Sequence, residues 1–379
     1  MASPKSIHDL LEIAIERHAS DLLLKAGSPP ALRVDGNHEL ATTDVLTFQD
    51  TEELVHSIIA ASTRDYLVQM GTATSKFTGE QMLERKVQAL HDMEEIDVAF
   101  TIEGLARVRS NLFLQRNTVG AALRIIPTAP QTIEELNLPP ILKDWSSQPK
   151  GLIIVTGPTG SGKSTTVSAM IEHINSTRQC HIITIEDPVE HIFEDKQSFI
   201  NQREVGSDTK THATALRSVL RQIPDVIMIG EMRDVDTIDV AITAGEVGHL
   251  VITTLHTTSA AVTIDRILNS FPPDGQRQIA IQLAASLIGV TSQRLVHRKN
   301  GKGRLPAMEI MAQSPTVKKL IEEEDTAELY AAIREGAHFG MNTMNQCLES
   351  LHQADQIAYD EAMLHAGDTV ELKQMLRRA

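Results

Sequence analysis

Short apolar runs alternate with amphipathic stretches in the second half of the chain. The runs lie at 152–155, 182–185, 226–229 and 250–254. Runs without polar alternation are typical of strands buried on both faces of a parallel sheet, whose connections are usually helices. The pattern therefore predicts an α/β domain over residues 141–379. A further strand is expected at 305–311, with a helical C-terminal region from about residue 313.

The first part of the chain has a mixed pattern. The expected elements are helices at 6–18 and 48–70, strands at 20–25, 31–34, 96–102 and 105–126, and a turn at Asp35-Gly36. The polar stretch 71–92 is expected to form either a loop or a protruding helix. Together these elements predict a small α+β domain over residues 1–126. Four prolines then mark a linker at 127–140, with one short helix expected at 132–136.

The chain is acidic and poor in aromatic residues, which narrows the classes of function. Its 35 basic and 50 acidic residues give a formal net charge of −15, and aromatic residues make up 3%. An acidic surface repels phosphate backbones, and few aromatic rings are left to stack on bases. We therefore expect no nucleic-acid partner.

Cysteine spacing and hydropathy indicate a cytoplasmic protein. Cys180 and Cys347 are far apart and fit no metal or redox motif. No apolar run approaches the roughly 18–20 residues that a membrane-spanning helix needs, and the N-terminus lacks a signal-peptide core. The sequence thus predicts no direct membrane span, so that any membrane role comes through a partner.

A complete phosphate-binding loop follows the run at 152–155. It consists of Gly157, Pro158, Thr159, Gly160, Ser161, Gly162, Lys163, Ser164 and Thr165. Its glycines let the backbone turn sharply and aim N–H groups at phosphate oxygens, and the helix that follows adds its positive end. The pattern assigns Lys163 to the β- and γ-phosphates and the Ser164 hydroxyl to Mg²⁺. ATP and Mg²⁺ are therefore the expected ligands.

Carboxylates follow two of the predicted strands. Glu231 comes after the run at 226–229, and Glu186, Asp187 and Glu190 come after the run at 182–185. Ligands of an open α/β sheet bind beyond the carboxyl ends of its strands, so these groups are expected near the phosphates. Glu231 is the candidate to polarise the attacking water or to hold the Mg²⁺ shell.

Two histidines, His249 and His256, flank the run at 250–254. Their spacing is not a usual zinc spacing, and no cysteine assists them, so a metal site is not expected. A histidine that follows a strand beside a phosphate site is suited to sense the γ-phosphate by hydrogen bonding. The alternative is that they are satisfied core histidines.

Arginines are candidates to neutralise the charge that develops during phosphoryl transfer. Arg109 and Arg124 lie in the last predicted strands of the first domain. Arg217 and Arg221 are four residues apart and are expected on one face of a helix. Arg233 follows Glu231 by two positions.

Taken in chain order, these motifs resemble the PilT-type retraction ATPases, within the wider superfamily of hexameric secretion ATPases. The resemblance covers nearly the whole chain. It is carried by residues 19–22, 27–30, 107–109, 157–165, 184–190, 202–206, 224–234, 248–257, 263–267 and 271–272. A colinear set of this kind is far more specific than a lone phosphate loop.

The resemblance implies a homohexamer whose subunits join a PAS-like N-terminal domain to a RecA-like ATPase domain. It implies ATP hydrolysis that drives type IV pilus retraction (twitching motility), with an inner-membrane pilus platform protein as partner and a peripheral place at the inner membrane. By position, the family's two carboxylates, two histidines and two N-domain arginines match Glu231, Glu190, His249, His256, Arg109 and Arg124.

Two departures from the family pattern favour an accessory, PilU-like motor that works beside a second retraction ATPase, whereas residues 230–234 match the PilT pattern and keep a primary motor open. The family's retraction signature is replaced at 316–323 by Thr-Val-Lys-Lys-Leu-Ile-Glu-Glu, and 221–224 reads Arg-Gln-Ile-Pro. Two other functions stay open. One is an assembly or secretion ATPase, which typically carries a further N-terminal domain and a four-cysteine zinc insertion. The other is a nucleotide-binding structural or regulatory subunit that hydrolyses little.

Overall fold

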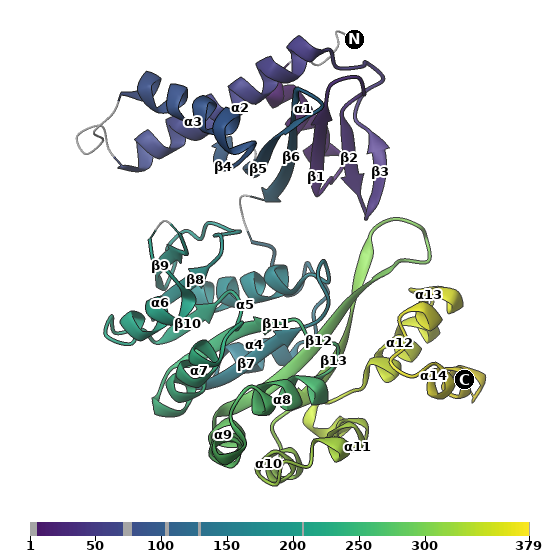
Figure 1. Ribbon diagram of the computed structural model, residues 1–379. Coiled ribbons are helices and arrows are strands. Elements are labelled where there is room, and N and C mark those ends of the chain that lie inside the picture. Colours follow the sequence, from purple (N-terminus) through teal and green to yellow (C-terminus); the bar gives the residue numbers. More distant parts are fainter. Residues whose placement is uncertain (1–5, 71–77, 103–105, 128–129, 207, 379) are drawn as a thin grey trace. The chain divides into compact units, whose positions relative to one another are not determined.

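The protein is described by a computed structural model that covers residues 6–70, 78–102, 106–127, 130–206 and 208–378. The chain divides into two compact units, Met1–Ala129 and Pro130–Ala379 (Figure 1). Each unit is described on its own. Within the described residues, no helix combines the length and the apolar character needed to cross a membrane.

The first unit is an antiparallel sheet of six strands in the order β3-β2-β1-β6-β5-β4. Its strands are β1 (Asp21–Lys25), β2 (Ala31–Val34), β3 (Asn37–Leu40), β4 (Glu95–Ile102), β5 (Ala106–Gln115) and β6 (Thr118–Pro127). Its helices are α1 (Ile7–Glu16), α2 (Phe48–Met70) and α3 (Gly79–Met93).

One face of this sheet is buried because alternate strand positions are apolar. Val108 and Leu112 of β5 are 0% exposed and share a core with Leu11 of α1 and Ile58 of α2. The intervening positions of β5 include Arg107, Arg109 and Asn111, which lie on the opposite face. The predicted strands and helices of this unit are present, and the polar stretch forms α3 from Gly79. Its first part, 71–77, lies outside the described residues.

The described part of the run expected at 105–126, which begins at Ala106, forms two strands with a tight turn between them. Arg116 and Asn117 have φ of 46° and 58°, so the turn is left-handed at both central residues. Such turns match the natural twist of a hairpin and usually carry glycine. The absence of glycine here left the break unmarked in the sequence. The expected helix at 132–136 is wrong: Thr132 and Glu135 exchange hydrogen bonds around a single turn that does not continue.

The second unit is built on a seven-stranded sheet in the order β13-β12-β7-β11-β10-β8-β9, parallel except for β13. The strands are β7 (Gly151–Thr156), β8 (His181–Glu186), β9 (Phe199–Glu204), β10 (Val226–Ile229), β11 (Leu250–Leu255), β12 (Leu287–His297) and β13 (Arg304–Ala312). The helices up to β12 are α4 (Ile141–Ser146), α5 (Lys163–Thr177), α6 (His212–Val219), α7 (Val235–Val247), α8 (Ala260–Asn269) and α9 (Pro273–Ser286).

The four predicted apolar runs are the central strands of this sheet. Every residue of β7, β10 and β11 is buried, as expected for parallel strands covered on both faces. Their carboxyl ends meet at one edge of the sheet, where the phosphate loop follows β7. The sequence did not indicate β9, which has no buried position and whose last four residues are polar, or β12, whose residues mix polar and apolar types.

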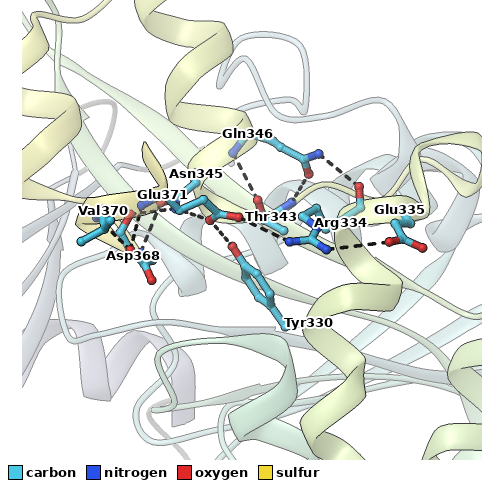
Figure 2. Close-up of polar contacts among 9 residues, drawn as sticks. All are labelled: Tyr330, Arg334, Glu335, Thr343, Asn345, Gln346, Asp368, Val370 and Glu371. Atoms are coloured by element: carbon cyan, nitrogen blue, oxygen red, sulfur yellow. Dashed lines mark hydrogen bonds and ion pairs between the residues drawn. The ribbon is translucent and has the colours of Figure 1, made fainter. Parts of the chain in front are cut away.

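The C-terminal region is helical, as predicted. It comprises α10 (Pro315–Glu322), α11 (Leu329–Glu335), α12 (Met344–Gln353), α13 (Tyr359–Leu364) and α14 (Thr369–Arg378). Its last helices pack on the β12–β13 hairpin through a separate small core that includes Val296 and Leu348. Figure 2 shows the polar contacts that join α11, α12 and α14 around Asn345 and Glu371.

Candidate nucleotide site

The phosphate loop has the backbone conformation that its glycines permit. Gly157, Gly160 and Gly162 have φ of 142°, 79° and 86°, which residues with a side chain rarely adopt. A Cβ atom at Gly157 would lie 2.3 Å from the carbonyl oxygen of Gln293. Helix α5 begins at Lys163, immediately after Gly162. The loop therefore presents its amides and the helix N-terminus together, the arrangement that binds phosphate.

Lys163 folds back over the loop. Its Nζ donates to the carbonyl oxygens of Gly157 and Pro158, each 3.0 Å away. Burial lowers the pKa of the Lys163 ammonium, and the nearby Glu190 carboxylate opposes that shift. The lysine thus carries its charge at the place where a phosphate would replace the two carbonyl oxygens.

His256 joins this lysine to the carboxylate of Glu231. Its Nδ1 lies 3.5 Å from Lys163 Nζ, and its Nε2 lies 2.9 Å from Glu231 Oε2. An ammonium has no lone pair to accept with, so Nδ1 accepts and Nε2 carries the proton that Glu231 receives. Burial lowers the pKa of His256, and the positive charges of Lys163, Arg233 and Arg266 lower it further. The ring is therefore neutral at pH 7.

The other oxygen of Glu231 contacts a cation. Arg233 Nε pairs with Glu231 Oε1, and Arg233 Nη1 lies 3.9 Å from Asp187 Oδ2. The Glu231 side chain is 13% exposed, so both of its oxygens are held in a nearly buried place. A carboxylate fixed in this way is suited to orient a water molecule beside the phosphate loop.

Glu186 and Glu190 lie on the next part of this edge. The Glu186 carboxylate accepts hydrogen bonds from Thr184 Oγ1 at 2.6 Å, Gln202 Nε2 at 3.2 Å and the Glu190 amide at 3.2 Å. Burial raises the pKa of Glu186 in spite of these donors. Because one of its donors is the Glu190 amide, Glu186 shapes the 186–190 turn, whereas Glu190 is half exposed and acts on Lys163 by its charge.

His249 is not brought to the phosphate loop of its own chain. It precedes β11, whereas His256 follows it, and the strand separates the two by about 20 Å at the usual rise per residue. His249 Nδ1 instead lies 2.8 Å from the carbonyl oxygen of Pro224. Only His256 of the predicted pair therefore belongs to the Lys163–Glu231 cluster.

The residues around the loop fit Mg²⁺ and a phosphate chain. Ser164 and Thr165 are half exposed on the first turn of α5, and carboxylates lie across the same edge of the sheet. Hydroxyl and carboxylate oxygens are the hard ligands that Mg²⁺ prefers. Ser161 Oγ is buried and has no hydrogen-bond partner within the described residues. A phosphate oxygen in the loop would give it one.

Arg109 and Arg124 lie in the first unit, opposite each other on β5 and β6. Together with Asp21, Arg33 and Asp97 they line a cavity of about 310 Å³ on the polar face of the sheet. Asp21 Oδ1 accepts from Arg124 Nε at 3.2 Å. Arg124 is therefore anchored through one nitrogen, and its side chain is 61% exposed.

The two arginines expected on one helix face lie in the second unit. Arg217 pairs with Asp236, and Arg221 lies beyond the end of α6.

Comparison with known proteins identifies the family. The family model described as type II/IV secretion system protein matches residues 122–358. The chain belongs to this family. It is 41% identical over 356 residues to the type IV pilus retraction ATPase PilT of Pseudomonas aeruginosa, covering 94% of this chain and 96% of that protein. It is 36% identical over 368 residues to the type IV pilus ATPase PilU of the same organism, covering 97% and 90%.

Solved structures agree with this placement. A crystal structure of the pilus retraction motor PilT with bound ADP matches with a TM-score of 0.81 and 39% identity, covering 97% of this chain and 99% of that one. The ATPase DotB of Legionella pneumophila matches with a TM-score of 0.79 and 26% identity, covering 94% of each chain. The expected resemblance to the PilT-type ATPases and the expected fold class are confirmed.

Proposed function

We propose that this chain is an ATP-hydrolysing motor that powers type IV pilus retraction. The observation that carries the proposal is the continuous contact from Lys163 through His256 to Glu231, placed beside a complete phosphate loop. That arrangement joins the group that binds the phosphates to the group that orients water. The similarity to PilT and PilU over almost the whole chain supports pilus retraction as the process that ATP hydrolysis drives.

The loop geometry supports a defined division of labour. The amides of 159–164 bind the phosphate chain of ATP, and Lys163 exchanges the carbonyl oxygens of Gly157 and Pro158 for phosphate oxygens. When Mg²⁺ is bound through Ser164, it neutralises charge on the phosphates. Glu231 orients the attacking water, and His256 holds Glu231 in place through its Nε2 proton.

We extend the proposal to the assembly. A homohexamer would let Arg109 and Arg124 reach nucleotide when units or subunits close, because exposed arginines anchored at one end are suited to phosphoryl charge. His249, which lies away from the loop of its own chain, would act across such a contact. The partner is an inner-membrane pilus platform protein, which would place this protein at the cytoplasmic side of the inner membrane.

Helix α10 supports an accessory, PilU-like role. Lys318 lies 3.9 Å from Glu322, and Lys319 lies 3.9 Å from Glu323, each one helical turn apart. The lysines are thus balanced within the helix, and no arginine is present in the segment to hold a partner by a planar fork. This segment replaces the family's retraction signature. A second retraction ATPase would then supply the missing contact.

Two other functions are weaker. The type II secretion system protein E of Xanthomonas campestris is 44% identical, but over only 40% of this chain, so a secretion role has a smaller basis than the pilus role. A non-hydrolysing structural subunit is disfavoured by the complete set of Lys163, His256 and Glu231 contacts.

Phosphate release from ATP by the purified chain tests the proposal. Wild type should turn over, and Lys163→Ala should be inactive while it stays folded, because the change removes a phosphate-binding charge from a loop. Lys302→Ala, which removes an exposed lysine on another loop of the same unit, serves as the control. Inactivity of the wild type would favour the structural subunit, and turnover by Lys163→Ala would remove the phosphate loop from catalysis.

A further inference from the structure

Gln293 of β12 is a buried polar residue that reaches the phosphate loop from far along the chain. It is 2% exposed. Its Nε2 donates to the carbonyl oxygen of Ser161 at 2.8 Å, and its Oε1 accepts from Thr166 Oγ1 at 2.7 Å. One amide therefore bridges the loop to the first turn of α5. A buried amide with both ends satisfied fixes the groups that it joins.

The backbone of the same residue also supports the loop. A Cβ atom at Gly157 would lie only 2.3 Å from the Gln293 carbonyl oxygen, and a Cβ atom at Gly162 would lie 2.9 Å from Gln293 Nε2. Leu295, two positions along β12 and on the same face, approaches Gly162 as well. At two of the three loop glycines, β12 therefore leaves no room for a side chain, in addition to the left-handed backbone angles.

The loop has few other fixed points among the described residues. Lys163 holds the carbonyl oxygens of Gly157 and Pro158, but those bonds must break when the lysine turns to a phosphate. The bonds of Gln293 point to Ser161 and Thr166 and need not break. Gln293 is therefore placed to keep the loop shaped while the lysine changes partners.

We propose that Gln293 is a positioning residue that preorganises the phosphate loop for nucleotide binding. The inference rests on the proposed ATPase function and deepens it. The expected effect is on nucleotide affinity. Without the bridge, the loop becomes ordered only when the nucleotide binds, and the entropy lost in that ordering makes the binding free energy less favourable. Turnover of the bound nucleotide should change little, because Gln293 contacts neither Glu231 nor His256.

The test is the Gln293→Met variant, which keeps the side-chain length and removes both hydrogen bonds. Binding of a fluorescent ADP analogue should weaken about tenfold, and the KM for ATP should rise by a similar factor, from the loss of two ordinary hydrogen bonds. The kcat should stay within about threefold of wild type. An affinity equal to that of the wild type would overturn the proposal.

Gln346→Met is the matched control. In the tail, Gln346 also donates one hydrogen bond to a carbonyl oxygen, that of Arg334 at 3.1 Å, and accepts one, from the Thr343 amide at 2.8 Å (Figure 2). Both variants should lose some thermal stability, but only Gln293→Met should lose affinity. Equal loss of affinity in the two variants would show a general structural effect and would also overturn the proposal.

A double-mutant cycle with Thr166→Val isolates the bridge. Thr166→Val removes the hydroxyl that Gln293 Oε1 accepts from, so the losses of affinity in the two single variants should not add in the double variant. Additive losses would contradict a shared bridge. Failure of the ATPase proposal is distinguishable, because the wild type would then bind the ADP analogue or ATP without turnover, or not at all.

Discussion

His256 donates the proton on its Nε2 to Glu231, over 2.9 Å between Nε2 and Oε2, while its Nδ1 faces Lys163. One neutral imidazole therefore contacts both the lysine that we assign to the phosphates and the carboxylate that we assign to the attacking water. When Lys163 turns to a phosphate, the partner of Nδ1 changes and the ring can transmit the change to Glu231. We infer that nucleotide binding and cleavage are linked through this side chain.

Removing the Glu231 carboxylate should separate binding from cleavage. Glu231→Ala should bind ATP but hydrolyse it about 10²–10⁴-fold more slowly, as is typical when a positioned base or water-orienting group is lost. Single-turnover phosphate release and nucleotide binding measure the two effects. Glu246→Ala, on an exposed position at the end of α7, is the control and should behave as wild type. Normal cleavage by Glu231→Ala would transfer the role to Glu190 or Glu186.

The pH dependence of turnover should report His256. Burial and the charges of Lys163, Arg233 and Arg266 lower its pKa, so the ring gains a proton only below the usual value of about 6.5. That proton would sit on Nδ1 against the lysine ammonium. Activity should therefore be full near pH 7 and fall on acidification, with a midpoint below 6.5. The acid limb should be absent from the profile of His256→Gln, and an unchanged limb there would assign it to another group.

Arg109→Ala and Arg124→Ala should lower turnover more than nucleotide affinity. Arginines that approach the phosphates at closure act on charge that develops in the transition state, where their worth reaches about 10³–10⁵-fold in the best cases. Steady-state kinetics separate kcat from KM. Arg85→Ala, on the exposed surface of α3, should have no effect. Unchanged turnover in both variants would remove these arginines from the nucleotide site.

The tail should depend on Asn345 for its stability. This side chain is 1% exposed and donates to the Asp368 carbonyl oxygen at 2.9 Å and to Glu371 at 2.6 Å, while its Oδ1 accepts from the Gly367 amide at 2.9 Å (Figure 2). Asn345→Ala leaves these groups unpaired and should cost about 2–3 kcal/mol. Chemical denaturation measures the change, and the exposed Asn269→Ala should shift it little. Equal small shifts would mean that the buried contacts are dispensable.

The groups that the sequence located best are those whose role is set by near neighbours. The loop at 157–165 and Glu231 each follow a buried strand directly, so strand identity alone places them at the carboxyl edge of the sheet. His249 and His256 look equivalent in sequence because both flank one run. The structure separates them because the two ends of β11 lie at opposite edges of the sheet. His249 precedes the strand and His256 follows it, so only His256 lies at the edge with the phosphate loop.

Contacts between distant segments could not be predicted in this way. Gln293 lies more than 120 residues beyond Thr166, and no local pattern marks a glutamine inside β12 as a partner of the loop. The pairing of Arg233 with Glu231 depends on side-chain direction after β10, which spacing does not give. The hairpin at Arg116-Asn117 was unmarked because two non-glycine residues take left-handed backbone angles there.

Twitching motility is the decisive measurement for a role in pilus retraction. The measurement is the zone of surface spreading of a piliated strain that lacks both native retraction ATPases, complemented with this chain alone or together with a PilT-type ATPase. We expect weak or no spreading with this chain alone, and more spreading with both proteins than with the PilT-type ATPase alone. No contribution in either setting would contradict a role in retraction, and full spreading with this chain alone would contradict the accessory role.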